Sequence, residues 1–194
     1  NESFEVNSID FSIDVLINNA GIAVARPIIE TSEEEWDEVL DTNLKSVFLY
    51  SKTVLPAMTA AARGVIINVS SILGKAGIAN FSAYCASKFG VIGFTQALAA
   101  ELKSKWIRAY AVCPGPTYTD LHRSVVGEEA ARLSMPPEKV AAKIVGLAIG
   151  EIYLASGSSL LVDEQPTDIS ANSIKNIFLS RLRPYYKFVR SLIR

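Results

Sequence analysis

The chain has 194 residues, a formal net charge of −1, 20% charged residues and 49% hydrophobic residues. These values are typical of a soluble globular protein and exclude a disordered chain or one that binds nucleic acids through a generally basic surface. The two cysteines, Cys85 and Cys113, form neither a CxxC pair nor a disulfide framework, so we expect a reducing, cytoplasmic compartment and no metal site.

The first part of the chain alternates a short apolar run with a longer helical pattern. The run VLIN at 15–18 predicts a strand, and the sequence Asn19-Ala20-Gly21 after it predicts a turn. Ser32 and three glutamates mark the start of a helix that should run to about Met58. The run VIINVS at 65–70 predicts a second strand, apolar on both faces.

The same alternation continues beyond this strand. A helix is expected from about Tyr84 to Leu102, followed by a strand at Ile107–Cys113 that ends at Pro114-Gly115-Pro116. Pro136 precedes a further helix, and EIYLA at 151–155 is expected to be the last strand. This order of strands and helices predicts βαβ crossovers and a parallel sheet of the α/β class.

Ligands of such a sheet bind beyond the carboxyl ends of its strands, where the connecting turns face one crevice. The turn after the first strand, Ser70-Ser71 after the second and Pro114-Gly115 after the third should therefore meet there. Tyr84 and Lys88 are four residues apart on one helix and so share a face. A nearby ammonium lowers the pKa of a phenol from about 10, which would make Tyr84 an acid or base near neutral pH.

Five motifs in this order resemble the short-chain dehydrogenase/reductase family. They are NNAG at 18–21, Asn43 in DTNLKSVF, Ser71 in NVSS, the YxxxK of Tyr84 and Lys88, and PGPTYT at 114–119. The separation of thirteen residues between Ser71 and Tyr84 also fits this family. The resemblance implies a Rossmann-like, doubly wound parallel sheet and hydride transfer between a ketone or secondary alcohol and NAD or NADP.

The resemblance also implies a role for each catalytic residue. Tyr84 would be the acid/base, and Lys88 would lower its pKa and bind the nicotinamide ribose. Ser71 would orient the substrate oxygen. Asn43 would hold a water that connects Lys88 to a proton relay.

Cofactor contacts are implied at two turns. Asn18, Ala20 and Gly21 would support the sheet and lie against the adenosine half of the cofactor. Backbone around Pro114, Gly115 and Thr117, with the hydroxyl of Thr119, would bind the nicotinamide carboxamide.

The sequence departs from the family pattern at both ends. It contains no TGxxxGxG turn, so we expect a truncated Rossmann-like domain at 1–168 that lacks the first three strands of the family fold. The pyrophosphate would then lose its main anchor, one edge or face of the sheet would be uncovered, and the residue that chooses between NAD and NADP would be missing. Residues 169–194 form a basic amphipathic pattern that predicts a helical tail.

Several alternatives stay open at this stage. The tail could pack on the body or on a partner subunit, or contact an anionic membrane peripherally. The substrate could be a 3-oxoacyl thioester, a steroid or other lipid ketone, or another small carbonyl compound. The resemblance implies a homo-oligomer that pairs through the two helices that carry Asn43 and Tyr84. A different interpretation is a shortened, non-catalytic relative that acts as a binding or regulatory partner. An in-frame TGxxxGxG segment upstream of this sequence would favour the enzyme, whereas a stop codon there would favour the non-catalytic relative.

Overall fold

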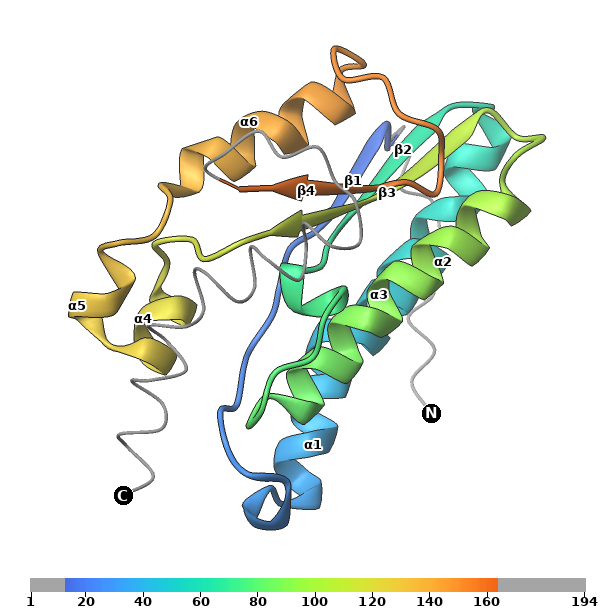
Figure 1. Cartoon of the computed structure of the whole chain (residues 1–194). Helices are drawn as coiled ribbons and strands as arrows, with labels where there is room; N and C mark the ends of the chain where they lie inside the picture. Colours follow the sequence, from blue (N-terminus) through green and yellow to red (C-terminus); the bar gives the residue numbers. More distant parts are fainter. Residues whose placement is uncertain (1–12, 164–194) are drawn as a thin grey trace.

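The computed structural model describes residues 13–163, which contain a sheet of four strands. The predicted tail at 169–194 lies outside these residues. The strands are β1 (Val15–Asn18), β2 (Gly64–Val69), β3 (Ile107–Pro114) and β4 (Ser159–Val162). They lie in the order β1-β2-β3-β4 and each pairs in parallel with its neighbour (Figure 1). The predicted parallel α/β fold is confirmed.

The connecting segments are mostly helical. The helices are α1 (Glu33–Leu40), α2 (Ser46–Ala60), α3 (Ser82–Glu101), α4 (Asp120–Val126), α5 (Glu128–Ala131) and α6 (Pro137–Ala148). Shorter elements are the 3-10 turns η1 (Ile28–Glu30) and η3 (Ile72–Gly74) and the π-helical turn η2 (Asp41–Lys45). Within residues 13–163, none of the helices combines the length and apolar character needed to cross a bilayer.

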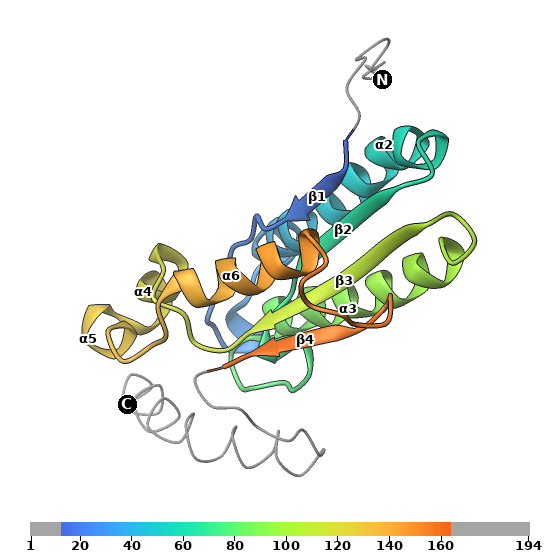
Figure 2. The same ribbon diagram turned by 90° about the horizontal axis from the view of Figure 1, so that it is seen from above.

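Helices cover both faces of the sheet, with α2 and α3 on one face and α6 on the other (Figures 1 and 2). Successive side chains of a strand point to opposite faces, so neighbouring residues of β2 join different cores. Ile66 packs in a cluster with Met58 of α2 and Leu98 of α3. Ile67 packs with Leu147 of α6 on the other face. This double covering explains why β2 is apolar on both faces.

The predicted helix from Ser32 to about Met58 is present, but it is not uniform. Ser32 and Glu35 form a reciprocal capping box, in which Ser32 Oγ accepts from Glu35 N and Glu35 Oε2 accepts from Ser32 N, each at 3.1 Å. The helix then widens into the π turn η2 at Asp41–Lys45. Such turns are rare and occur frequently at functional sites. This one contains Asn43, whose exposed fraction is only 1%.

The predicted strand at 151–155 is wrong. The chain leaves α6 through Gly150 at φ +80°, crosses this segment as a loop, and turns again at Gly157 at φ +90° before β4 begins. Ile152 and Leu154 pack against the core without pairing in the sheet. In this loop the partly buried Ile152 and Leu154 alternate with exposed residues, and this alternation imitates the pattern of a half-buried strand.

The outer edge of β1 is only partly covered by the described residues. The exposed fractions of Ile13, Val15 and Ile17 are 37%, 38% and 46%. Within residues 13–163, β1 pairs with β2 alone. Among these residues, its outer edge therefore leaves apolar side chains and backbone groups accessible. The expectation of an uncovered edge in the whole protein stays a prediction.

Candidate active site

The predicted site residues gather at the carboxyl ends of the first three strands. Asn18 is the last residue of β1, Ser71 caps the η3 turn after β2, and Pro114 ends β3. Tyr84 and Lys88 lie in the first half of α3. Residues that are far apart in sequence thus meet where ligands of parallel sheets bind.

Ser71 is the hydroxyl that reaches Tyr84. Its Oγ accepts a hydrogen bond from Leu73 N at 3.1 Å, which fixes it at the start of η3, and its side chain lies close enough to the Tyr84 phenol to lower the pKa of that group. The neighbouring Ser70 has a different role: its hydroxyl donates to Lys88 O at 2.8 Å. Ser71 therefore lies beside the phenol, whereas Ser70 is bonded to the α3 backbone.

Lys88 is a nearly inaccessible cation beside the phenol. Its side chain has an exposed fraction of 3%, and its Nζ donates to Val69 O at 3.0 Å. The same Nζ lies 5.6 Å from the centroid of the Tyr84 ring. Burial penalises the ammonium and lowers the pKa of Lys88 to about 8, so the group is still mainly charged at neutral pH.

The direction of the Tyr84 pKa differs from the sequence-based expectation. Burial raises the pKa of Tyr84 above 10.0, and the Ser71 side chain lowers it by less. The net shift is upward because burial disfavours the phenolate more than its surroundings favour it. The expected lowering of this pKa by Lys88 stays a prediction.

Asn43 ties the loop after β1 to the start of α3. Its Oδ1 accepts from Ile22 N at 2.8 Å, and its Nδ2 donates to Ile22 O at 2.9 Å and to Ser87 Oγ at 3.0 Å. Ser87 in turn donates to Tyr84 O at 2.8 Å. The side chain of Asn43 is therefore occupied by protein groups, and its predicted role toward a bound water stays a prediction.

Sequence reasoning missed Ser87 as part of this arrangement. The residue is fully buried, and it joins Asn43 to the turn that carries Tyr84. Its position between Tyr84 and Lys88, as a hydroxyl on a helix of small residues, is the only signal that the sequence offers.

The turn at 18–21 lies directly against two of the candidate catalytic side chains. A Cβ placed on Gly21 would be 3.2 Å from Asn43 Oδ1 and 3.3 Å from Lys88 Nζ, so this position has little room for a side chain. Asn18 supports the sheet from the same turn: its Nδ2 donates to Asn68 Oδ1 at 2.7 Å and to Ser51 Oγ at 3.4 Å. The contact of Ala20 and its neighbours with an adenosine stays a prediction.

The segment after β3 is organised by its own threonines. Thr117 Oγ1 donates to Gly115 O at 2.9 Å. Thr119 caps α4, accepting from His122 N at 3.2 Å and donating to Thr117 O at 3.4 Å. These bonds hold the backbone around Pro114 at the crevice, and its contacts with a carboxamide stay predictions.

The residues present fit one half of a nicotinamide dinucleotide. The ammonium of Lys88 has more N–H donors than the one that Val69 O accepts, and hydroxyls of Ser71 and Tyr84 lie beside it; this donor set suits a ribose and a substrate oxygen. No glycine-rich turn suited to a pyrophosphate occurs in the described chain. Within residues 13–163, no cluster of three or more His, Cys, Asp or Glu residues could hold a metal ion.

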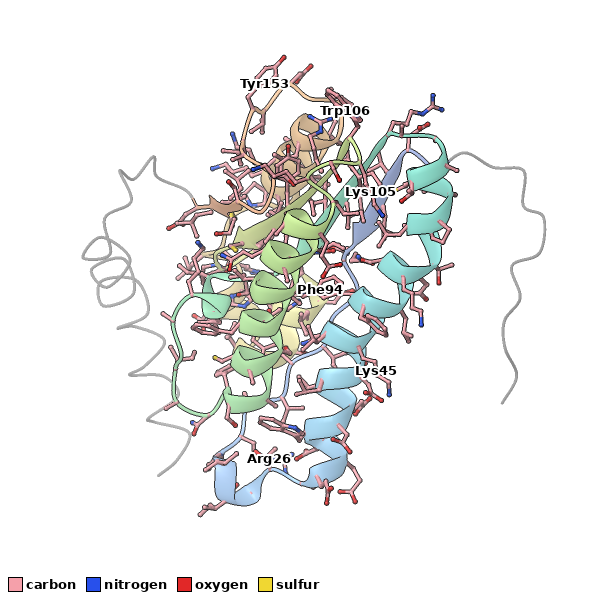
Figure 3. The ribbon with its side chains drawn as sticks, turned by 90° about the vertical axis from the view of Figure 1, so that its right-hand side faces the viewer. Arg26, Lys45, Phe94, Lys105, Trp106 and Tyr153 are labelled. Carbon is pink, nitrogen blue, oxygen red and sulfur yellow. The ribbon has the colours of Figure 1, made fainter. Side chains whose placement is uncertain are left out.

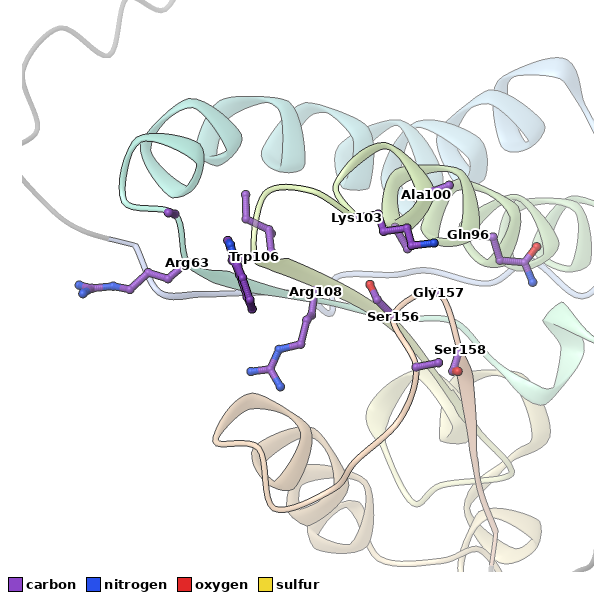
Figure 4. A pocket seen from close by; sticks show the side chains of 13 residues that line it. Arg63, Gln96, Ala100, Lys103, Trp106, Arg108, Ser156, Gly157 and Ser158 are labelled. Carbon is purple, nitrogen blue, oxygen red and sulfur yellow. The ribbon is translucent and has the colours of Figure 1, made fainter.

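A groove of the described chain lies elsewhere. It measures about 1070 Å³ and is lined by residues that include Arg63, Gln96, Ala100, Lys103, Trp106 and Arg108 (Figure 4). We call it the Trp106 groove. None of the predicted site residues lines it. The chemistry of the side chains favours a candidate site at the carboxyl ends of the strands instead.

Comparisons with known proteins show the family of the chain. The family described as short chain dehydrogenase matches residues 6–130. A 3-oxoacyl-[acyl-carrier-protein] reductase of Vibrio cholerae serotype O1 is 38% identical over 160 residues, covering 78% of this chain and 65% of the relative. The chain thus spans a little under two thirds of that protein's length.

Solved structures give the same result. A 3-oxoacyl-[acyl-carrier protein] reductase of Brucella melitensis with bound NAD is 34% identical with a TM-score of 0.69, covering 78% of this chain and 61% of that chain. A gluconate 5-dehydrogenase of Burkholderia cenocepacia in complex with NADP and tartrate is 26% identical with a TM-score of 0.73, covering 80% and 65%. The fold around the candidate site is therefore one that holds either nicotinamide cofactor in other proteins.

Proposed function

Because the chain belongs to the short-chain dehydrogenase/reductase family, we propose that it forms the catalytic part of an NAD- or NADP-dependent oxidoreductase. The reaction interconverts a ketone and a secondary alcohol. The observation that carries this proposal is the pairing of Ser71 with Tyr84 beside the buried ammonium of Lys88. A hydroxyl donor, a phenol and a cation at one point are the groups that proton transfer to a carbonyl oxygen needs.

Each residue has a separate part in the reductive direction. Ser71 donates a hydrogen bond to the ketone oxygen and orients it. Tyr84 transfers its phenolic proton to that oxygen as negative charge develops there, and the nearby Lys88 cation stabilises the phenolate that remains. When bound at this site, a nicotinamide cofactor would supply the hydride for the carbonyl carbon. In the oxidative direction, the same phenolate takes the proton back from the alcohol.

The raised pKa of Tyr84 is consistent with the first step of reduction. Burial keeps the phenol protonated at neutral pH, so the proton that reduction requires is already in place. Release of that proton leaves a phenolate that must be stabilised, which is the contribution assigned to Lys88. Candidate substrates remain 3-oxoacyl thioesters, lipid ketones and other small carbonyl compounds.

The first experiment is a titration of the 194-residue chain with NADH and with NADPH, followed by cofactor fluorescence, with circular dichroism as a check on folding. Micromolar binding by the folded chain supports the proposal and leads directly to a screen of carbonyl substrates. The proposal is overturned if the folded chain binds neither cofactor and a protein extended at its N-terminus also fails to bind. The non-catalytic relative would then be the better interpretation.

The Tyr84→Phe variant tests the mechanism in a complete, active version of the protein. We expect kcat to fall by about 10² to 10⁴, because general acid catalysis contributes on this order, while cofactor affinity changes little. Tyr153→Phe is the matched control, since Tyr153 is 87% exposed and does not line the site. Near-normal turnover of Tyr84→Phe would rule out the acid/base role.

A further inference from the structure

The Trp106 groove carries no role in the proposed reaction, yet it has the features of a binding surface. It lies at the amino-terminal ends of the strands, next to the residues that begin β3 and precede β2 and β4. Its floor is largely apolar, and cationic side chains of Arg63, Lys103 and Arg108 stand around it (Figure 4). A groove of about 1070 Å³ is large enough for the side chains of a polypeptide turn.

Two aromatic residues are displayed at this end of the molecule (Figure 3). Trp106 is 83% exposed and adopts a φ of +58°, a conformation that is costly for a residue with a side chain. Tyr153 is 87% exposed. Tryptophan, tyrosine and arginine are the residue types that most often dominate the energetics of protein interfaces. An exposed tryptophan held in an unfavourable conformation beside a groove therefore indicates a partner.

The charge of the groove restricts what that partner can be. Arg63 is paired with Asp14 through its Nε at 2.6 Å. In the described part of the chain, neither Lys103 nor Arg108 takes part in an ion pair. The groove therefore presents uncompensated positive charge around an apolar floor. Its occupant should carry acidic side chains next to exposed apolar ones.

A surface of that kind lies at the opposite end of the same molecule. It consists of η1 and α1, residues 28–38, and we call it the acidic knob. Its tip exposes Ile28 at 60% and Ile29 at 90%. Its exposed acids are Glu30, Glu33, Glu34, Asp37 and Glu38, none of which is ion-paired with a described side chain.

The position of the knob relative to the groove is visible in the figures. Figure 3 shows Arg26, which precedes the knob, at one end of the molecule, and Trp106 and Tyr153 at the other. Figure 1 shows α1 at the same far end. The two complementary surfaces therefore cannot meet within one copy.

We propose that the acidic knob of one copy docks in the Trp106 groove of a second copy. Ile28 and Ile29 enter the apolar floor beside Trp106, and the acids of α1 face Lys103 and Arg108. Because the two surfaces differ and lie at opposite ends, the contact is heterologous, and each copy keeps one free knob and one free groove. The full chain should therefore form head-to-tail assemblies whose size grows with concentration and falls with salt.

A mixed cross-link tests this geometry directly. Ile28→Cys and Ala100→Cys are made in separate full-length chains; the native Cys85 and Cys113 are both buried. Under mild oxidation we expect a disulfide-linked dimer from the mixture and none from either variant alone. Cross-linking of Ala100→Cys with itself would mean that groove faces groove, and the absence of a cross-link in the mixture would mean that the two surfaces do not meet. Either result overturns the proposal.

The charge complementarity has its own control. Adding Lys103→Glu and Arg108→Glu to the Ala100→Cys chain should reduce the yield of the mixed dimer about tenfold, as expected for loss of interactions worth about 1.4 kcal/mol. Lys139→Glu and Lys143→Glu make the same change of charge on the exposed face of α6 and should leave the yield unchanged. If both pairs of substitutions lower the yield of the mixed dimer equally, the decrease comes from the change in net charge. That result would overturn the assignment of the groove as the docking site.

Discussion

Lys88 carries a charge that the fold holds almost entirely out of water. Its exposed fraction is 3%, and Val69 O at 3.0 Å is the acceptor for its Nζ. Burial lowers the pKa of Lys88 from 10.5 to about 8. Keeping the protonated amine in this position therefore costs stability, which is consistent with a residue retained for its chemistry.

The Lys88→Met variant should therefore be more stable than the parent chain near neutral pH. The parent binds fewer protons when folded than when unfolded between pH 8 and 10.5, so the contribution of Lys88 to stability rises with pH across this window. The gain from Lys88→Met, up to about 3 kcal/mol, should shrink across it and vanish above it. Urea unfolding of both chains at a series of pH values measures this difference.

Cys113 has an opposite effect on stability in this pH range. Burial raises the pKa of Cys113 to about 11, so Cys113 makes stability fall between pH 9 and 11 in both chains. The fall should be larger in the variant, because Lys88 is one of the groups that lower the pKa of Cys113 in the parent, and this adds to the shrinking of the gain with pH. Lys45→Met is a suitable control, because the side chain of Lys45 is 60% exposed. A stability gain from Lys88→Met that does not change with pH would contradict the assignment of the low pKa to Lys88.

At the scale of elements, the packing of η3 on α3 sets the position of the reacting groups. Gly74 of η3 lies very close to the backbone of α3. A Cβ at this position would lie 2.6 Å from Lys88 O and would also collide with Ser70 Oγ. Backbone at Lys88 cannot give way without moving α3. The absence of a side chain at Gly74 therefore lets the turn that holds Ser71 approach the helix that holds Tyr84.

Gly74→Ala should lower the free energy of unfolding by about 1 to 3 kcal/mol, the usual cost of overpacking a well-packed interior. Gly77→Ala is the matched control, because nothing lies within 4 Å of the position its Cβ would take. In a complete enzyme, only Gly74→Ala should also reduce kcat, since it displaces Ser71 from Tyr84. Equal stability of the two variants in urea unfolding would show that the turn can move without cost.

The elements differ in how far the sequence predicts them. β2 and β3 were predictable because a strand covered on both faces must be continuously apolar, and α3 because its motif and length are distinctive. The π turn at Asp41–Lys45 was not, since it leaves no change in the apolar pattern. The position of β4 was predicted wrongly, because the loop at 151–155 alternates apolar and polar residues more regularly than the strand that follows it. The bond between Asn43 and Ser87 joins residues 44 positions apart, and only the packed helices reveal it.

At the scale of the whole molecule, two further apolar surfaces are only partly covered by the described residues. One is the edge of β1 with Ile13, Val15 and Ile17. The other is the outer face of α2 and α3, where Phe48, Leu49, Tyr50 and Phe89 are 45%, 49%, 61% and 46% exposed. The edge of β1 could pair with another strand. The outer face of α2 and α3 is broad and helical, and could pack against the same face of a second copy.

We therefore expect a two-fold dimer through α2 and α3, separate from the head-to-tail contact of the Trp106 groove. The two helices also form a shallow groove of about 450 Å³, lined in part by Leu44, Phe48 and Phe94, into which the partner's side chains can pack. The double variant Phe48→Glu and Phe89→Glu would bury charges in this interface, so its dissociation constant should rise by about tenfold or more.

Sedimentation velocity at several concentrations, in high salt to suppress the head-to-tail contact, measures that change. Leu133→Glu is the control, because Leu133 is 83% exposed and lies on neither helix. Dimers that persist in the Phe48→Glu and Phe89→Glu variant, or that dissociate equally in Leu133→Glu, would place the two-fold contact elsewhere. Because α3 also carries Tyr84 and Lys88, a dimer through this face would brace the helix that holds the reacting groups, and the monomeric variant should then lose stability as well as its partner.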